Sequence, residues 1–500
     1  MFFCIFIVLN RPLTMIRLLV LLSIIGLLSC QSSKQEDTVD SRPNILFILV
    51  DDLGKEWVSC YGAEDIETPN IDALAKSGML FHNVYSMPQC TPTRLTFLTG
   101  QYPFRHGWVN HWDVPRWGGG AHFDERLNPS AANYMREAGY ATAIAGKWQI
   151  DDFRVEPDAL VKAGFEEYCM WTGYETGIPE SAERFQDAYI FTKSGSKTYD
   201  GSFGPDVFKD FLIQFMQKDR DQPFFAYYPM VLTHPPLVNT PDESADEPIG
   251  KHKAMVRYTD KILGEMVTAL EAAGKRKNTV IIWTTDNGTS RGLVGNYKGQ
   301  SVDGGKSKTT ESGIASPFIV SWPAKVKPKQ STQDLVDFTD LLPTFLDLAG
   351  ATVPQKLQLH DVEYPLDGHS FKPSLLNPGQ ATGRPWILSM GGGNRAKLTE
   401  QGVENQYVFR DRVVRNKQYK LYINTEAQAE QFFDLIADPF ETTNLIEELN
   451  TEERRSNFEE LSQIIPSFPA KDAEPRYHPN PPQEWDVEIT AESQTWKLRK

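Results

Sequence analysis

The sequence predicts an α/β fold with a large central sheet flanked by helices. The clearest observation is the segment 44–50, in which six apolar residues follow Asn44, as is typical of a strand buried on both faces. An amphipathic pattern at 253–273, stopped by Gly274, predicts a long helix, and a β-branched strand follows at 279–284. This alternation is typical of a sheet with helices on both sides.

Further elements repeat the alternation. Thr68-Pro69 predicts a helix start, and Gly78 its end. The remaining predicted elements of the large domain are helix 131–137, strand 141–145, strand 224–231, strand 317–322 and helix 337–348.

The pattern changes after Asn377-Pro378-Gly379. Short strands are predicted at 386–389, 406–410, 419–423 and 431–435, followed by a helix at 452–465. These elements predict a small C-terminal α+β domain. We therefore divide the folded chain into a large N-terminal domain at 43–380 and a C-terminal domain with its tail at 381–500.

The first 42 residues are predicted to be a processing and tether segment. Arg17 precedes an apolar stretch at 18–28, which is short for a membrane span and typical of a signal peptide. Leu27-Leu28-Ser29-Cys30 resembles a bacterial lipobox, which predicts lipidation of Cys30 and places residues 1–30 in a lipoprotein signal segment. An ordinary signal peptide or an N-terminal anchor is the alternative. The polar stretch 31–42 is predicted to be a flexible tether, and the protein to be an exported envelope lipoprotein that meets the membrane only through its lipid.

Composition narrows the function classes. The net charge is −15 with a pI near 5.2, which argues against a nucleic-acid partner but permits a local basic pocket. Outside the signal segment and Cys90, only Cys60 and Cys169 remain, so a disulfide framework is excluded and one bridge is left open.

Two pairs of oxygen-bearing side chains follow predicted strands. Asp51-Asp52 comes directly after 44–50, and Asp286-Asn287 follows 279–284. The carboxyl ends of strands are where ligands bind in open α/β sheets. Three carboxylates and an amide oxygen suit Ca²⁺ or Mg²⁺. Either pair alone would more simply be a turn or helix cap.

Cys90-Thr91-Pro92-Thr93-Arg94 has the spacing C-x-P-x-R. Residues 94–98 are predicted to begin a helix, which would place residue 90 at a helix N-terminus, where backbone N–H groups favour an anion. An ordinary buried cysteine is the alternative. A thiol protease would need histidine and amide partners, which no local signature supplies.

These motifs together resemble the type I sulfatases of the alkaline-phosphatase superfamily, over about residues 43–445. The stretches that carry the resemblance, in order, are Asn44-Ile45-Leu46, Asp51-Asp52, the C-x-P-x-R motif, Thr99-Gly100-Gln101-Tyr102-Pro103, Gly146-Lys147-Trp148, Thr233-His234-Pro235, Asp286-Asn287-Gly288, Gly305-Lys306, Glu311-Ser312-Gly313-Ile314, Pro317-Phe318, Phe433-Asp434-Leu435, Asp438-Pro439, Glu441 and Asn444-Leu445.

The resemblance implies that a maturation enzyme oxidises Cys90 to formylglycine. An oxygen of the hydrated aldehyde then attacks sulfur, releases the alcohol and leaves a sulfate ester that is afterwards expelled. The resemblance also implies a divalent cation, Ca²⁺ or Mg²⁺, that polarises the sulfate. Its implied ligands are Asp51, Asp52, Asp286 and Asn287, together with residue 90.

Further roles are implied for basic side chains. Arg94 would steady the diol, and Lys147, His234 and Lys306 would neutralise the sulfate oxygens. His234 is also a candidate acid for the leaving group. Lys308 lies close enough in sequence to be the ligand in place of Lys306.

Gln149 departs from the family pattern, which has a histidine two residues after the lysine of Gly-Lys-Trp. Gln149 can hydrogen-bond to the substrate but cannot take a proton at neutral pH. The proton must then go to His234, to another histidine such as His106 or His111, or to water.

The predicted function is hydrolysis of sulfate esters, with sulfated polysaccharides or oligosaccharides as the substrate. One alternative is a phosphomonoester or phosphonate hydrolase of the same superfamily, since a tetrahedral anion and a metal serve both reactions. The other is a catalytically impaired protein that binds sulfated glycans, for which Gln149 is the support.

Overall fold

The computed structural model describes residues 42–109, 122–359, 362–380, 383–391, 397–399, 402–404 and 409–486. The predicted signal segment with Cys30, and all of the predicted tether except Arg42, lie outside these residues. None of the described helices has the length and apolar character needed to cross a membrane.

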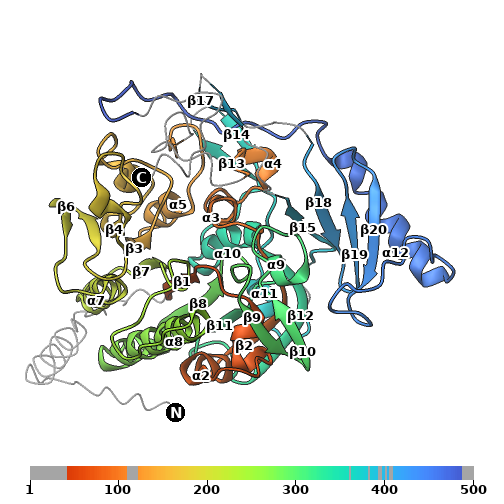
Figure 1. Cartoon of the computed structure of the whole chain (residues 1–500), viewed down its shortest axis with the longest axis horizontal. Helices are drawn as coiled ribbons and strands as arrows, with labels where there is room; N and C mark the ends of the chain where they lie inside the picture. The colour runs from red at the N-terminus through yellow and green to blue at the C-terminus, as the bar shows by residue number, and fades with distance from the viewer. Residues whose placement is uncertain are drawn as a thin grey trace, which may run out of the picture. The chain divides into compact units, whose positions relative to one another are not determined.

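A sheet of ten strands forms the centre of the large domain (Figure 1). The strand order is β12-β2-β11-β8-β1-β7-β3-β4-β5-β6. Strands β8, β1, β7, β3 and β4 run parallel, whereas β11 and β5 pair antiparallel with their neighbours. The bounds are β1 Asn44–Val50, β2 Met79–Tyr85, β3 Ala141–Lys147, β4 Glu167–Trp171, β5 Tyr189–Thr192, β6 Gly195–Thr198, β7 Phe224–Pro229, β8 Thr279–Thr285, β11 Phe318–Ser321 and β12 Gln330–Asp337. The predicted α/β fold is confirmed, with a mixed sheet.

Helices cover both faces of this sheet, as β1 shows residue by residue. Its odd-numbered residues from Ile45 to Leu49 pack into one apolar core with α3, α5 and α10. Its even-numbered residues from Leu46 to Val50 pack into a second core with α2, α7 and α8. Successive strand side chains point to opposite faces, so an uninterrupted apolar strand requires a cover on each side. These helices are α2 Pro69–Lys76, α3 Cys90–Thr99, α5 Ala131–Glu137, α7 Gly204–Gln217, α8 Pro248–Ala272 and α10 Leu341–Leu348.

Several predicted elements coincide with the observed ones. Strand 44–50 and helix 131–137 have the predicted bounds, and β8 is one residue longer than predicted. Helix α8 begins five residues before the predicted start, because Pro248 occupies its first turn, where a missing N–H costs nothing. The predicted helix 337–348 is divided into a 3₁₀ turn, Phe338–Asp340, and α10.

The C-terminal elements form a separate antiparallel sheet in the order β15-β18-β19-β20, beside helix α12 Glu452–Ser462 (Figure 1). Its strands are β15 Ile387–Met390, β18 Arg412–Arg415, β19 Tyr419–Ile423 and β20 Ala429–Asp434. The predicted small C-terminal sheet domain is confirmed. The predicted strand 406–410 is wrong where it can be compared: 409–410 lie outside a strand, 406–408 are not described, and β18 follows instead.

Shorter elements complete the connections. They are α4 Pro103–His106, α6 Ala159–Lys162, α9 Glu311–Ile314, α11 Lys372–Leu376, the hairpin β9 Val294–Tyr297 and β10 Gln300–Asp303, and the two-stranded pairs β13 Lys356–Leu359 with β14 Val362–Pro365 and β16 Lys397–Thr399 with β17 Gly402–Glu404. Cys60 and Cys169 are free thiols, so the possible bridge between them is not formed.

Candidate active site

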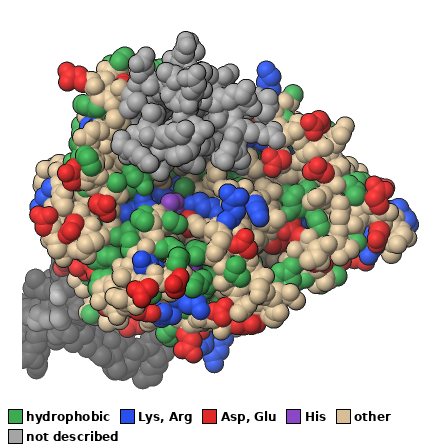
Figure 2. Space-filling model, in the orientation of Figure 1, with side chains coloured by type: hydrophobic (Ala, Val, Ile, Leu, Met, Phe, Trp, Pro, Cys, Tyr) green, Lys and Arg blue, Asp and Glu red, His purple; other side chains and the backbone are tan. Residues whose placement is uncertain are grey.

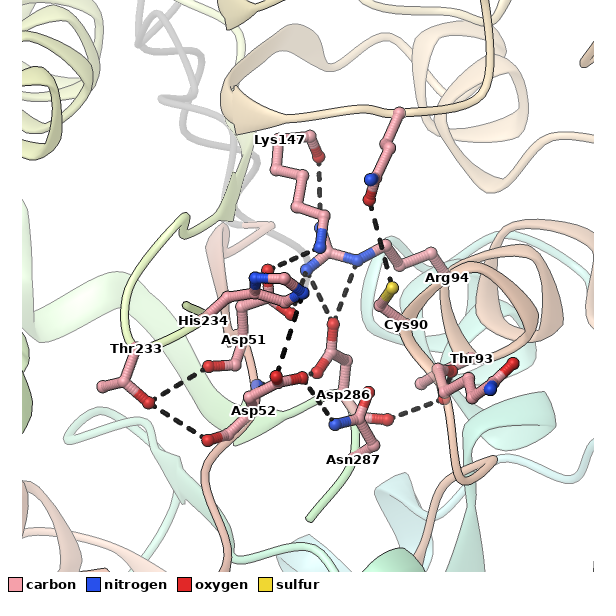
Figure 3. A network of polar contacts seen from close by, with 12 residues as sticks. Asp51, Asp52, Cys90, Thr93, Arg94, Lys147, Thr233, His234, Asp286 and Asn287 are labelled. Atoms are coloured by element: carbon pink, nitrogen blue, oxygen red, sulfur yellow. Dashed lines mark hydrogen bonds and ion pairs between the residues drawn. The ribbon is translucent and has the colours of Figure 1, made fainter. Parts of the chain in front are cut away.

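Four neighbouring parallel strands end at one edge of the sheet and supply most of the predicted site. Strand β1 leads into Asp51-Asp52, β8 into Asp286-Asn287, and β7 into the loop that carries His234. Strand β3 ends at Lys147 itself. The predicted polar clusters therefore lie together, as Figure 3 shows, because parallel strands place their carboxyl ends at the same edge.

The acidic part of the site is fully buried. Asp51, Asp52 and Asp286 are at most 1% exposed. The backbone N–H of Asp52 donates to Oδ1 of Asp286 at 3.2 Å, and Nδ2 of Asn287 donates to Oδ1 of Asp52 at 2.8 Å. Sγ of Cys90 lies within 4.8 Å of a carboxylate oxygen of both Asp51 and Asp286. The predicted metal ligands thus lie close together.

Each carboxylate has a cation beside it. Nζ of Lys147 lies 2.6 Å from Oδ2 of Asp51. Nη2 of Arg94 lies 2.7 Å from Oδ2 of Asp286. Together with Lys306, these side chains bring positive charge to the cluster.

The structure places Lys306, and not Lys308, in this cluster. Nζ of Lys306 lies 2.6 Å from Oδ2 of Asp52. Lys308 lines a different cavity. Ser307 between them has a left-handed φ of +72°, so the chain turns sharply there and the two lysines lie on different sides.

Crowding of charge shifts the pKa values of these groups in different directions. Burial alone would raise the pKa of Asp51, but Lys147 and the other nearby cations hold it far below its usual range. Burial and the charge of Asp51 raise the pKa of Asp286 to about 7. Burial and the neighbouring Lys306 lower the pKa of His234 to about 3, against the attraction of Asp52. At neutral pH His234 is therefore neutral.

The oxygen atoms of the cluster fit a divalent cation. Oδ1 of Asp51 and Oδ1 of Asn287 are buried and accept no hydrogen bond from the described residues. Buried oxygen atoms without partners are rare in proteins, and hard oxygen ligands are those preferred by Ca²⁺ and Mg²⁺. A cation would also relieve the repulsion between Asp51 and Asp286.

Residue 90 is the first residue of helix α3, so its predicted place at a helix N-terminus is confirmed. Its side chain is 5% exposed, and Thr93 fixes the turn by donating its hydroxyl to the backbone oxygen of Asp286 at 2.6 Å. The helix begins four residues before the predicted Arg94, since Pro92 is tolerated within a first turn.

Gln149 faces residue 90 from the loop that follows strand β3. Its Oε1 lies 4.0 Å from Sγ of Cys90, and its backbone has a left-handed φ of +65°. The alternative proton acceptor His106 is fully buried, and its ring nitrogens contact the hydroxyl of Thr96 and the backbone N–H of Trp108. His111 lies outside the described residues.

Four contributors to the site were given no role from the sequence. Thr233 donates its hydroxyl to the backbone oxygen of Asp52 at 3.0 Å, and Ser290 donates to Oδ2 of Asp52 at 2.7 Å. The guanidinium of Arg184 lies 3.0 Å from Nδ1 of His234. The fourth is Thr93. Thr93 and Thr233 lie within quoted motifs, whereas Ser290 and Arg184 belong to no motif and are brought to the site only by the folded chain.

The surface above the strand ends carries a local excess of cations. On the face shown in Figure 2, lysine and arginine side chains gather beside a histidine, although the whole chain has a net charge of −15. Basic side chains are thus gathered locally on a chain that is acidic overall.

A mixed α/β sheet with this acid cluster and a cysteine at a helix N-terminus is the arrangement that the resemblance to the sulfatases predicts. The chain belongs to the sulfatase family, whose family model, Sulfatase, matches residues 43–351. It is therefore a sulfatase.

Relatives of known name agree with this assignment. N-acetylgalactosamine-6-sulfatase of Rattus norvegicus is 31% identical over 395 residues, covering 74% of this chain and 71% of the relative. The ulvan-active sulfatase of Formosa agariphila is 26% identical over 449 residues, covering 82% of this chain and 77% of the relative.

Solved structures share the fold. Ps i-CgsB superimposes with a TM-score of 0.69 at 24% identity, covering 92% of this chain and 97% of that one. The phosphonate monoester hydrolase of Agrobacterium radiobacter has a TM-score of 0.61 at 17% identity, covering 85% and 96%. At these identities the likeness concerns the fold alone.

Proposed function

We propose that this sulfatase removes sulfate from sulfated carbohydrates, with formylglycine made from Cys90 as nucleophile and with a bound Ca²⁺ or Mg²⁺. The observation that supports this most directly is the position of residue 90. It begins helix α3, and its side chain lies within 4.8 Å of carboxylate oxygens of Asp51 and Asp286.

The cation would be held by Asp51, Asp52, Asp286 and Asn287, with residue 90 beside it. When bound, it would polarise the sulfate and lower the pKa of the attacking oxygen. Residue 90 would supply that oxygen, and the N-terminus of α3 would favour the negative charge that develops on it.

The surrounding side chains would bind and orient the sulfate. Lys147 and Lys306 bring ammonium groups to the same cluster, each 2.6 Å from a carboxylate oxygen. Arg94 is anchored by Asp286 and also donates from Nη1 to the backbone oxygen of Lys147 at 3.1 Å, so its guanidinium is fixed before substrate arrives. Gln149 can hydrogen-bond to the sulfate or to residue 90.

His234 is the best-placed group for the leaving oxygen. Its Nε2 lies 3.9 Å from Oδ2 of Asp52, so it borders the same space as the sulfate-binding lysines. A neutral imidazole can take up the proton that leaves residue 90, and the imidazolium formed can give that proton to the departing oxygen. The contact with Arg184 fixes the ring from the other side.

Carbohydrate as the substrate class is supported by the relatives, whose names specify N-acetylgalactosamine 6-sulfate and ulvan. We further propose that the chain is exported and lipidated at Cys30, that residues 43–380 form the catalytic domain, and that a formylglycine-generating enzyme matures Cys90. These proposals rest on the sequence motifs.

The test combines chemistry at residue 90 with substrate choice. Mass spectrometry should find an aldehyde in place of the thiol at residue 90 in active protein. Parallel assays should compare sulfated mono- and oligosaccharides with phosphomonoesters and phosphonates, using the Cys90→Ala variant as control. Faster turnover of phosphorus esters would favour the same-fold alternative, and binding of sulfated sugar without turnover by verified aldehyde protein would favour the impaired binding protein.

A further inference from the structure

A second cavity, of about 910 Å³, lies outside the catalytic cluster. It is bordered by strand β2, the β9–β10 hairpin, the segment around α9 and the C-terminal sheet. Its volume is within the range of pockets that hold small ligands. None of the predicted catalytic or metal-binding residues lines it.

Three lysines lining this cavity form no close ion pair with the described residues. Lys55, Lys298 and Lys308 make no ion pair within 4 Å with any carboxylate of the described residues. Nζ of Lys55 donates instead to the backbone oxygen of His82 at 2.9 Å. Burial lowers the pKa of Lys55 to about 8, and Arg415 and Lys298 repel it, against the attraction of Glu311. Cations crowded in this way are stabilised by an anion.

The acids that line the cavity already have partners. Glu311 and Glu441 lie 3.0 and 2.8 Å from Nζ of the fully buried Lys420. Oδ1 of Asp303 accepts from the backbone N–H of Gly292 at 2.8 Å, and Glu56 accepts from the hydroxyl of Thr289. The lining of the cavity therefore favours binding of an anion over binding of a cation.

The wall also offers aromatic surface. Tyr297 and Phe440 pack edge to face with ring centroids 6.3 Å apart. Both rings are partly exposed, and Lys298 lies over the ring of Tyr297 at 5.0 Å. Aromatic faces beside cationic groups suit a ligand that has apolar C–H faces and acidic substituents, as a sulfated sugar has.

We propose that this cavity binds a sulfate-bearing segment of the saccharide chain, apart from the sugar whose sulfate is cleaved. The inference rests on the proposed function and names a second contact with the same substrate class. Two loops join the sites: one carries Asp52 and Lys55, and the other carries Lys306 and Lys308. A chain held in the cavity would raise the effective concentration of its other sulfates near the catalytic cluster.

The experiment uses a size-defined dextran sulfate octasaccharide as probe and neutral dextran of the same length as control. Lysine acetylation followed by peptide mass spectrometry should show protection of Lys55 and Lys298 by the sulfated probe. Lys325 and Lys327, exposed on another part of the surface, should acetylate equally with and without it. Unprotected Lys55 and Lys298 at saturating probe, or equal protection by neutral dextran, would overturn the proposal.

Variants give an independent measurement. Lys298→Gln should weaken probe binding about tenfold. The Lys55→Gln/Lys298→Gln double variant should weaken it further, because each substitution removes a charge-assisted contact. The matched control is Lys325→Gln/Lys327→Gln, which should bind as the wild type does. Unchanged affinity of the double variant for the probe would contradict the assignment of the binding site to this cavity. Protection of the two lysines by inorganic sulfate alone would contradict the proposal that the ligand is a saccharide.

Hydrolysis of 4-nitrophenyl sulfate separates this inference from the proposed function. The double variant should keep the wild-type kcat/KM on that small ester, because neither lysine lies in the catalytic cluster. If the wild type hydrolyses no sulfate ester but protection of Lys55 and Lys298 persists, the proposed function fails and the cavity assignment stands.

Discussion

Oε1 of Gln149 lies 4.0 Å from Sγ of Cys90, and the Gln149 side chain faces residue 90 from the loop that follows strand β3. An amide can donate and accept hydrogen bonds, but it cannot take a proton at neutral pH. The position where related enzymes are expected to have a histidine is thus filled by a group without acid–base chemistry. The proton that leaves residue 90 must go elsewhere.

We expect His234→Ala to be nearly inactive and Gln149→Ala to be milder. Loss of one hydrogen bond to a charged group costs roughly 1.5–3 kcal/mol, or about 10–100-fold in rate. Loss of general acid–base catalysis adds a further 10²–10⁴-fold or so. Steady-state kcat and KM of both variants on one sulfate ester give the comparison.

Gln149→His serves as the matched variant, since it restores a titratable ring at the same position. It should keep activity and can quicken sulfate release. The opposite ranking, a near-normal rate for His234→Ala with an inactive Gln149→Ala, would make Gln149 the essential partner.

Cys90→Ala should abolish turnover while leaving the fold intact, because the cysteine lies at a helix start and alanine keeps the apolar contacts there. Thermal unfolding measures the fold, and sulfate release measures turnover. Cys169→Ala, which changes another buried cysteine away from the site, should stay active. Full activity from protein that contains only the unmodified thiol would contradict the mechanism.

Removal of divalent cations should abolish activity, and Ca²⁺ or Mg²⁺ should restore it better than Zn²⁺, because the ligands are oxygen atoms. Cation at about 100 times its Kd should stabilise the fold by roughly 2.7 kcal/mol. Asp286→Asn should lose most of this stabilisation, whereas Asp242→Asn at an exposed site should keep it. Turnover unaffected by prolonged chelation would exclude a required metal.

The sequence was a good guide to the sheet centre and to the motif residues. The apolar strand 44–50 had to be covered on both faces, and the polar pairs after strands had to meet at one edge. Helix 131–137 was equally clear, because alanine-rich helical spacing ends at a glycine.

Other parts could not be foreseen. Edge strand β12 begins Gln330-Ser331-Thr332-Gln333, a polar run that takes strand form only because it pairs with β2. Arg184 contacts His234, which is 50 residues away in the sequence, and no local sequence pattern predicts such a contact. The choice between Lys306 and Lys308 depended on the backbone turn at Ser307.

Arg384 should be important for stability at the start of the C-terminal sheet. Its buried guanidinium contacts Asp340 and lies 3.1 Å from Oδ2 of Asp337. Arg384→Met would leave two buried carboxylates without their cation, so we expect a loss of about 3–5 kcal/mol in the free energy of unfolding. The exposed Arg136→Met should cost less than about 0.5 kcal/mol. Equal denaturant midpoints for the two variants would contradict this role.

Glu56 should make stability depend on pH near neutrality. Burial raises its pKa to about 7, although the Thr289 hydroxyl donates to it. The unfolded chain, with a pKa near 4.5, ionises first, so folding loses stability as the pH rises from about 4.5 through 7. Glu56→Gln stays neutral and should match the wild type at pH 4. Above pH 7 it should be more stable by up to roughly 3 kcal/mol. Unfolding midpoints of both proteins across this range test the prediction, with Glu64→Gln at the exposed surface as control. A difference that does not change with pH would show that Glu56 is ionised in the folded protein.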